Sequence, residues 1–258
     1  MLGSDTLPSV PRQIIIGDVH GHYDALMSLV EKIDPRGNDQ LYFLGDLIDR
    51  GPQSADVVRF VMENQYPCLL GNHEEMLLFA ISPSGEINRE ALQNWLSAGG
   101  NATLASYNNR IPHEHLLWLR ERPMYLDLGD VWLAHAGVDP KLAIAEQTSE
   151  QFCWIRDRFH ASVKPFFENK TIVTGHTLTF TLPGVEPGQL AAGMGWLDIE
   201  TGAYHRNSGW LTGLDFVHHT VYQFNAYSLS FRERSLAEAV TPVDLERLWN
   251  RRRLRQRR

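Results

Sequence analysis

The chain has 258 residues, of which 43% are hydrophobic and 21% charged, with a net charge of −7. This length allows one large domain or two small ones, and the composition is that of a soluble globular protein. No stretch approaches the run of about 18 apolar residues that a membrane span needs, and the acidic balance argues against nucleic acid as the main partner. The N-terminus has no secretory signal, and two cysteines, Cys68 and Cys153, are too few for a disulfide framework, so we expect a cytoplasmic protein.

The first half of the sequence alternates strand and helix patterns. Three apolar runs, each ending in glycine, predict buried strands: 13–17, 40–45 and 66–71. Between them, apolar residues recur at helical spacing over 26–33 and 57–62, the second helix with Ser54 as its N-cap. A third helix begins near Glu74. This β-α-β-α-β order predicts a core of parallel strands with helical crossovers.

The second half of the sequence changes character. Residues 86–122 read as helical with polar faces, and strand patterns separated by turns follow, including an expected hairpin at 200–202. We therefore predict an α/β fold of two packed mixed β-sheets flanked by helices, forming a single domain over 1–230. Residues 231–258 are predicted to be a helical, arginine-rich extension.

Polar side chains follow the predicted strands where each strand ends. In chain order they are Asp18, His20, Asp46, Asn72, His73, His135 and His176. Because the carboxyl ends of parallel strands meet along one edge of a sheet, we expect these side chains to converge. Oxygen and imidazole ligands without thiolate suit manganese, iron or zinc. Six ligands from this set of seven side chains would be too many for one metal and suit two metals that share a carboxylate.

The ordered motifs "GDVHG", "GDLIDRG" and "GNHE", followed by "HAG" and "GH", resemble those of the PPP-type metallophosphatases within the calcineurin-like metallophosphoesterases. The likeness runs from about residue 13 to 217 and includes "WLSAGGNATLASY". It implies a four-layer metallophosphoesterase sandwich. It also implies hydrolysis of phosphoserine and phosphothreonine in proteins or peptides, with phosphotyrosine as a further substrate, by direct attack of a metal-bridging hydroxide.

The resemblance assigns six metal ligands. They are Asp18 and His20 for the first ion, Asn72, His135 and His176 for the second, and Asp46 as the bridge between both. Two divalent cations are expected, with manganese as the first candidate and iron or zinc as the alternatives.

The resemblance also implies the residues that act on the substrate. His73 would be the general acid that protonates the leaving oxygen, and Asp49 would orient its ring. Arg50 would bind phosphate oxygens through a bidentate fork. Arg156 would be the second phosphate-binding arginine, with Arg158 as a close rival.

Other interpretations stay open. Enzymes that split diadenosine tetraphosphate are similar but typically carry "ARG" for "DRG" and "GNHD" for "GNHE", so Asp49 and Glu74 favour the phosphomonoesterase here. The complete ligand set disfavours a non-catalytic phosphate-binding module. Residues 247–258 carry seven arginines and no acid. They are either a fraying helix end, whose deletion leaves turnover unchanged, or an anchor for an acidic partner.

Overall fold

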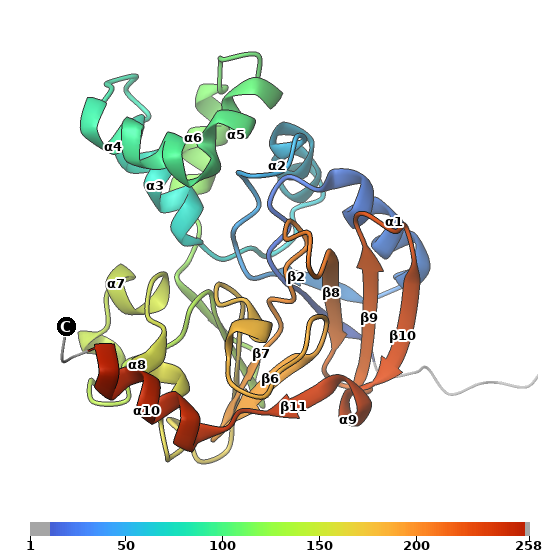
Figure 1. Cartoon of the computed structure of the whole chain (residues 1–258). Coiled ribbons are helices and arrows are strands. Elements are labelled where there is room, and N and C mark those ends of the chain that lie inside the picture. Colours follow the sequence, from blue (N-terminus) through green and yellow to red (C-terminus); the bar gives the residue numbers. More distant parts are fainter. Residues whose placement is uncertain (1–10, 256–258) are drawn as a thin grey trace, which may run out of the picture.

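The computed structural model describes residues 11–255, with the side chains of 11–250. Two β-sheets lie face to face with helices on their outer sides (Figure 1). The strand order is β10-β9-β8-β1-β2 in the first sheet and β11-β6-β7-β5-β4-β3 in the second. Strands β1 and β2 run parallel, as do β4, β5 and β7. The predicted α/β sandwich of two mixed sheets is confirmed.

The described elements have the following bounds. The first sheet contains β1 (Gln13–Ile16), β2 (Gln40–Phe43), β8 (Trp210–Asp215), β9 (Thr220–Asn225) and β10 (Phe231–Ser235). The second contains β3 (Tyr125–Asp127), β4 (Val131–Ala134), β5 (Thr171–Thr174), β6 (Leu190–Gly193), β7 (Trp196–Asp198) and β11 (Val240–Pro242). The helices are α1 (Tyr23–Ile33), α2 (Ser54–Glu63), α3 (Asn72–Ala80), α4 (Arg89–Trp95), the π-helical turn η1 (Leu96–Gly100), α5 (Asn101–Ser106), α6 (His113–Arg120), α7 (Ser149–Phe152), α8 (Asp157–His160), α9 (Leu236–Ala239) and α10 (Leu245–Arg255).

The isoleucines of β1 show how the sequence builds the layers. Because side chains alternate along a strand, Ile14 and Ile16 face the helical side, where they join the cluster that includes Leu26 and Leu29 of α1. Ile15 faces the other way, into the apolar layer between the two sheets. These side chains are all fully buried. An apolar strand without polar alternation is therefore covered on both faces, as the sequence pattern indicated.

The predicted third strand over 66–71 is wrong. The structure has an isolated bridge between Phe43 and Cys68, formed by hydrogen bonds from the Phe43 N–H to Pro67 O and from the Leu69 N–H to Phe43 O, both 2.9 Å long. Pro67 has no N–H to donate to a longer ladder. The chain bends directly into α3, so Asn72 begins a helix at the sheet edge.

Two local predictions also fail. Ser54 is the first residue of α2, with Gln53 before it, so it is not the N-cap. Its hydroxyl instead accepts the N–H of Asp49 at 3.1 Å. The expected hairpin at 200–202 is absent, because β7 ends at Asp198 and the loop over 199–209 leads to β8 in the other sheet.

The stretch predicted as a helical extension begins with strands. β10 pairs antiparallel with β9, and β11 pairs parallel with β6, so this stretch contributes to both sheets. In α10, Leu248 is buried, and the Trp249 indole donates to the carbonyl of Ala161. Deleting 247–258 would therefore remove a core side chain, so the start of this segment is not a fraying helix end, while unchanged turnover after the deletion stays a prediction. The side chains of 251–258 lie outside the described residues.

Neither cysteine forms a disulfide in the structure. Cys68 and Cys153 are both free and buried. Among the described residues, no helix combines the length and apolar character that crossing a membrane requires.

Candidate metal centre

The loops after four strands and the first turn of α3 deliver polar side chains to one edge of the sandwich. Asp18 and His20 follow β1, Asp46 follows β2, and Asn72 opens α3. His135 and His176 follow β4 and β5 in the same way. These six residues are buried. The structure therefore brings together the ligand-type side chains that the sequence placed at strand ends.

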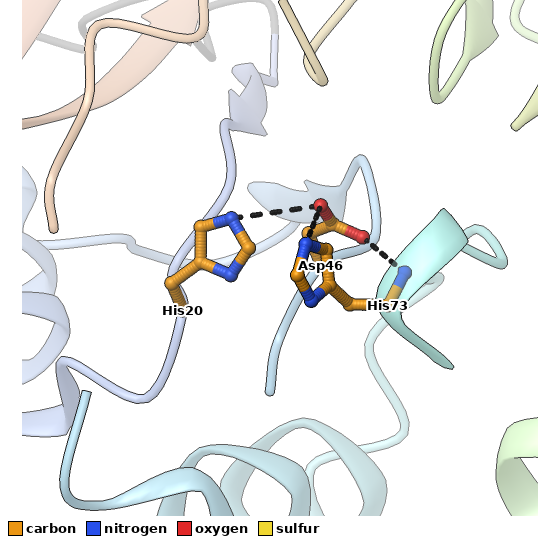
Figure 2. Close-up of side chains that lie close together, drawn as sticks. All are labelled: His20, Asp46 and His73. Atoms are coloured by element: carbon orange, nitrogen blue, oxygen red, sulfur yellow. Dashed lines mark hydrogen bonds and ion pairs between the residues drawn. The ribbon is translucent and has the colours of Figure 1, made fainter. Parts of the chain in front are cut away.

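Asp46 lies at the centre of the cluster. Its Oδ2 is 3.5 Å from Nε2 of His20 and 3.9 Å from Nε2 of His73. Figure 2 shows the two imidazole rings beside the Asp46 carboxylate, with these contacts as dashed lines. Its Oδ1 is 3.4 Å from Nε2 of His135. Two groups of ligand atoms, each lying within 4.8 Å, share this carboxylate: His20–Asp46–His73 and Asp46–His135–His176. One carboxylate between two groups is what a pair of neighbouring cations requires.

Asn72 joins the second group. Its Oδ1 lies 3.0 Å from Nε2 of His135 and 2.8 Å from Nδ1 of His176. Asp18 reaches the centre from the β1 side, where its Oδ2 accepts the N–H of His176 at 3.0 Å. His73, expected as the general acid, also lies within reach of the first group, and Asp18 stays a predicted ligand.

The histidines of the centre favour the neutral state. Burial lowers the pKa of His20, His135 and His176 below the usual imidazole value, and the charge of Arg50 lowers that of His20 further. A neutral imidazole has the free nitrogen lone pair with which it binds a metal.

The surroundings of two buried carboxylates, Asp18 and Glu200, disfavour their negative charge. Burial raises the pKa of Asp18, and the nearby carboxylates of Glu200 and Asp46 raise it again. The pKa of Glu200 is likewise raised, by burial and by the nearby carboxylate of Asp198. Asp18 Oδ1 and His176 Nε2 are buried with no hydrogen-bond partner among the described residues. Divalent cations would supply both the missing positive charge and the missing partners, so these residues fit a metal centre.

Backbone conformation at the centre is unusual. His20, Asp46, Asp49, Arg50 and His176 have φ values of 46°, 45°, 73°, 69° and 66°, in the left-handed region that residues other than glycine seldom adopt. Such strain clusters at functional sites, where the surrounding structure must compensate for it. The loops are therefore held in these shapes by tertiary contacts rather than by local preference.

A buried hydrogen-bonded pair adjoins the cluster. Nδ1 of His73 lies 2.6 Å from Oδ2 of Asp49, and neither side chain is more than 2% exposed. Because Nδ1 faces the carboxylate, Nε2 of His73 is directed toward the centre, where the guanidinium of Arg50 lies 2.9 Å away. The other amino group of Arg50 lies 2.6 Å from Nε2 of His20.

The structure separates the two rival arginines. A guanidinium nitrogen of Arg156 donates to the carbonyl of His176 at 3.3 Å and to Oγ1 of Thr177 at 3.2 Å, which places it at the rim of the centre. Arg158 pairs instead with Asp139 at 2.5 Å, and its side chain is 55% exposed. Arg50 and Arg156 are both exposed, although the ligand-type side chains below them are buried.

Sequence reasoning missed several residues that contact the site. Trp95 and Thr103 both hydrogen-bond to Asp49, and the ring of Tyr204 lies 3.9 Å from the guanidinium carbon of Arg50. Asp198 and Glu200 are buried beside the centre. Trp95 and Thr103 belong to the noted motif "WLSAGGNATLASY". Its position in the sequence gave no indication that it returns to the loop after β2.

This fold, with buried aspartates and histidines clustered at one sheet edge, defines a metallophosphoesterase. The chain belongs to the calcineurin-like phosphoesterase family, whose model matches residues 11–180. The nature of the metal ions and the narrower assignment to PPP protein phosphatases do not follow from this membership.

Curated relatives carry a different function from the one the motifs favoured. The chain is 34% identical over 135 residues to the bis(5'-nucleosyl)-tetraphosphatase, symmetrical, of Chromobacterium violaceum, covering 51% of this chain and 45% of that protein. It is 32% identical over 143 residues to the protein of the same name from Vibrio cholerae, covering 53% of this chain and 49% of that protein. The chain thus spans about half the length of the curated relatives it matches.

A solved structure supports the fold. A crystal structure described as that of a putative diadenosine tetraphosphatase superimposes with a TM-score of 0.59 at 21% identity, covering 89% of this chain and 96% of that one. At this identity the likeness concerns the fold alone.

Proposed function

We propose that this chain hydrolyses phosphoric anhydrides and esters at a two-cation centre, with a symmetrical dinucleoside tetraphosphate as the first candidate substrate. The observation that carries this choice is the 34% identity to a symmetrical bis(5'-nucleosyl)-tetraphosphatase. It outweighs the two motif letters, Asp49 and Glu74, on which the preference for phosphoserine and phosphothreonine depended.

The cluster around Asp46 would hold the cations. When bound, two divalent ions acidify coordinated water and offset negative charge on phosphate oxygens. Asp46 would be shared, and the remaining ligands would be Asp18, His20, Asn72, His135 and His176. Manganese is the first candidate because the donors are oxygen and imidazole nitrogen, with iron and zinc as alternatives.

Four further side chains would act on the substrate. Arg50 and Arg156 would bind phosphate oxygens, since both are exposed at the mouth of the centre and carry guanidinium groups suited to two parallel hydrogen bonds. His73 would protonate the leaving oxygen from Nε2. Asp49 would accept the Nδ1–H of His73 and favour the imidazolium form, in which Nε2 carries the proton that passes to the leaving oxygen.

A second candidate is the hydrolysis of phosphate monoesters of serine and threonine, with tyrosine as a further case. The buried Asp49–His73 pair favours it, because an alkoxide is strongly basic and must be protonated as it leaves. Symmetrical cleavage of a dinucleoside tetraphosphate releases a nucleoside diphosphate, whose terminal phosphate is weakly basic and needs this help far less.

The two candidates separate in a parallel assay with manganese supplied. Diadenosine tetraphosphate and a phosphoserine peptide are given to the unaltered protein, to Asp49→Ala, and to Asp56→Ala, a matched control at an exposed ion pair with Arg59. We expect the dinucleotide to have the higher kcat/KM. Asp49→Ala should lower peptide turnover by about 100-fold or more and dinucleotide turnover by less than about 10-fold.

Faster cleavage of the peptide would replace the first candidate by the second. Absence of turnover of either compound, and of a generic aryl phosphate, by folded and metal-loaded protein would refute both and leave a non-catalytic phosphate-binding module.

A further inference from the structure

The motif over 95–103 packs against the loop that carries Asp49 and Arg50. It spans the end of α4, the turn η1 and the start of α5, and we call it the clamp segment. We propose that Trp95 and Thr103 of the clamp segment are positioning residues that hold Asp49 in the orientation required for proton donation by His73. This inference rests on the proposed function insofar as it assigns that proton transfer to His73.

The clamp segment supplies donors to both oxygens of the Asp49 carboxylate. The Trp95 indole N–H lies 2.9 Å from Oδ2 and 3.1 Å from Oδ1. The Thr103 hydroxyl donates to Oδ1 at 2.7 Å, while its oxygen accepts the Asp49 N–H at 2.8 Å. Asp49 and Thr103 are both 0% exposed, so water does not compete for these bonds.

These bonds fix the plane of the carboxylate. Oδ2 accepts from His73 and from Trp95 together, so rotation of Asp49 about its side-chain bonds would break contacts at both residues. The orientation of the His73 ring follows from the orientation of its acceptor. Trp95 and Thr103 therefore act on His73 through Asp49, without touching the centre themselves.

The clamp segment also holds the backbone of Arg50. The Arg50 N–H donates to the carbonyl of Gly99 at 3.2 Å, which supports the left-handed conformations of Asp49 and Arg50. Gly99 has a φ of 121°, and a Cβ there would lie 2.9 Å from Cγ of Arg50. A Cβ on Gly100 would lie 2.4 Å from the Trp95 ring. The two successive glycines therefore allow the clamp segment to pack closely against Arg50 and against the ring of Trp95.

Packing alone would not require these polar contacts. Trp95 belongs to the apolar cluster on the helical side of the first sheet, and a large apolar side chain would satisfy that cluster. The indole N–H and the Thr103 hydroxyl are directed at one carboxylate from two different helices. Their shared target distinguishes positioning from filling of space.

The test uses three variants. Thr103→Val removes the hydroxyl at nearly constant shape, Thr103→Ser restores it, and Trp95→Phe removes the indole N–H. Each is assayed with manganese on an aryl phosphate with a weakly basic leaving group and on an alkyl phosphate. We expect Thr103→Val and Trp95→Phe to lower kcat on the alkyl phosphate about 10- to 100-fold, with KM unchanged, and to lower it less than about 3-fold on the aryl phosphate. Thr103→Ser should behave like the unaltered protein.

A second readout is independent of activity. In the folded protein without substrate, the Nδ1–H proton of His73, held against Asp49, should give a low-field NMR signal. This signal should persist in Thr103→Ser and be lost or exchange-broadened in Thr103→Val, with both variants showing the native thermal unfolding transition.

Two results would overturn the proposal. One is an equal loss of kcat on both substrates in Thr103→Val, which is the pattern of a general structural defect. The other is an unchanged His73 signal in that variant. If the protein turned over neither phosphate, the proposed function would fail, and the NMR signal alone would then decide whether the clamp segment positions His73.

Discussion

Glu74 ties the loop after β2 to the start of α3, and replacing it with glutamine tests how that loop is held. Its carboxylate accepts four backbone N–H groups: those of Asp46 and Leu47 at 2.8 Å, Gly71 at 3.1 Å and Ile48 at 3.3 Å. Two of these groups face Oε1 and two face Oε2. Glu74 is 1% exposed, so water cannot replace a lost acceptor.

The cost of Glu74→Gln follows from this geometry. Glutamine has one carbonyl oxygen, so its amide nitrogen must face two of the four N–H groups whichever way it turns. Each buried N–H left without an acceptor costs about 1–3 kcal/mol, which gives a loss of about 2–6 kcal/mol in the free energy of unfolding. The position of Asp46 should loosen with it, and metal affinity should fall.

The ionisation state of Glu74 decides whether this reasoning holds. Burial and the neighbouring carboxylates of Asp46 and Asp49 raise the pKa of Glu74 to about 8, whereas four N–H donors on its two oxygens favour the ionised form. The geometry fits the ionised form, because a protonated oxygen would point a hydrogen at an N–H donor. Bound cations would favour the ionised form as well.

The measurement is urea unfolding at pH 7 with and without manganese, together with metal content after gel filtration. Glu121→Gln removes the same charge from a side chain that is 75% exposed, and as a control it should change stability by less than about 0.5 kcal/mol. If Glu74→Gln were as stable as the unaltered protein and retained its metal, Glu74 would be protonated and the argument from four donors would be wrong.

Three other predictions follow from the structure. Arg156→Ala should raise the KM of a phosphate substrate about 10- to 100-fold, because a charged hydrogen bond to the substrate is lost. Arg158→Ala should leave KM unchanged. Equal effects of the two substitutions in steady-state assays would contradict the placement of Arg156. Asp39→Asn should cost about 1 kcal/mol of unfolding free energy at pH 7. Burial opposes ionisation of Asp39, but hydrogen bonds from Arg12 and the backbone hold its pKa at about 2. The stability difference between the two proteins is therefore fully present above the pKa that Asp39 has in the unfolded chain, and it disappears as the pH falls toward 2. Urea unfolding from pH 7 downward checks this. Truncation after residue 250 should leave the melting temperature and aryl phosphate turnover unchanged. Truncation after residue 246 removes the buried Leu248 and should lower the melting temperature by several degrees. Equal melting curves for the two truncated proteins would show that α10 does not stabilise the domain.

The positions of the ligand-type side chains were predictable because they depend on a simple rule. Asp18, Asp46 and His135 each follow an apolar run that is long enough to be a buried strand. Parallel strands bring their carboxyl ends to one edge, so sequence order alone indicated convergence. The predicted strand over 66–71 was wrong, but the position of Asn72 was still predicted correctly, because a single bridge is enough to bring Asn72 to the same edge.

The surroundings of those side chains were not predictable in the same way. Trp95 and Thr103 reach Asp49 across 46 and 54 residues of sequence, through helices whose path depends on packing. Glu200 lies in a loop that the sequence pattern indicated as a hairpin. Local patterns specify periodicity and turns, whereas these contacts depend on how separate elements stack. The preference for phosphoserine and phosphothreonine depended on single motif letters, whereas the proposed substrate depends on similarity over a longer stretch of sequence.

The late position of β10 and β11 in the chain has a consequence for synthesis. The first sheet gains its β10 edge, and the second its β11 edge, only when residues 231–242 become available. Until this segment leaves the ribosome tunnel, the nascent protein exposes the unpaired backbone N–H and C=O groups of β9 and β6. Strands of other chains can pair with these groups. A ribosome stalled upstream of this point would release fragments prone to aggregate, although the residues around Asp46 would already have been translated.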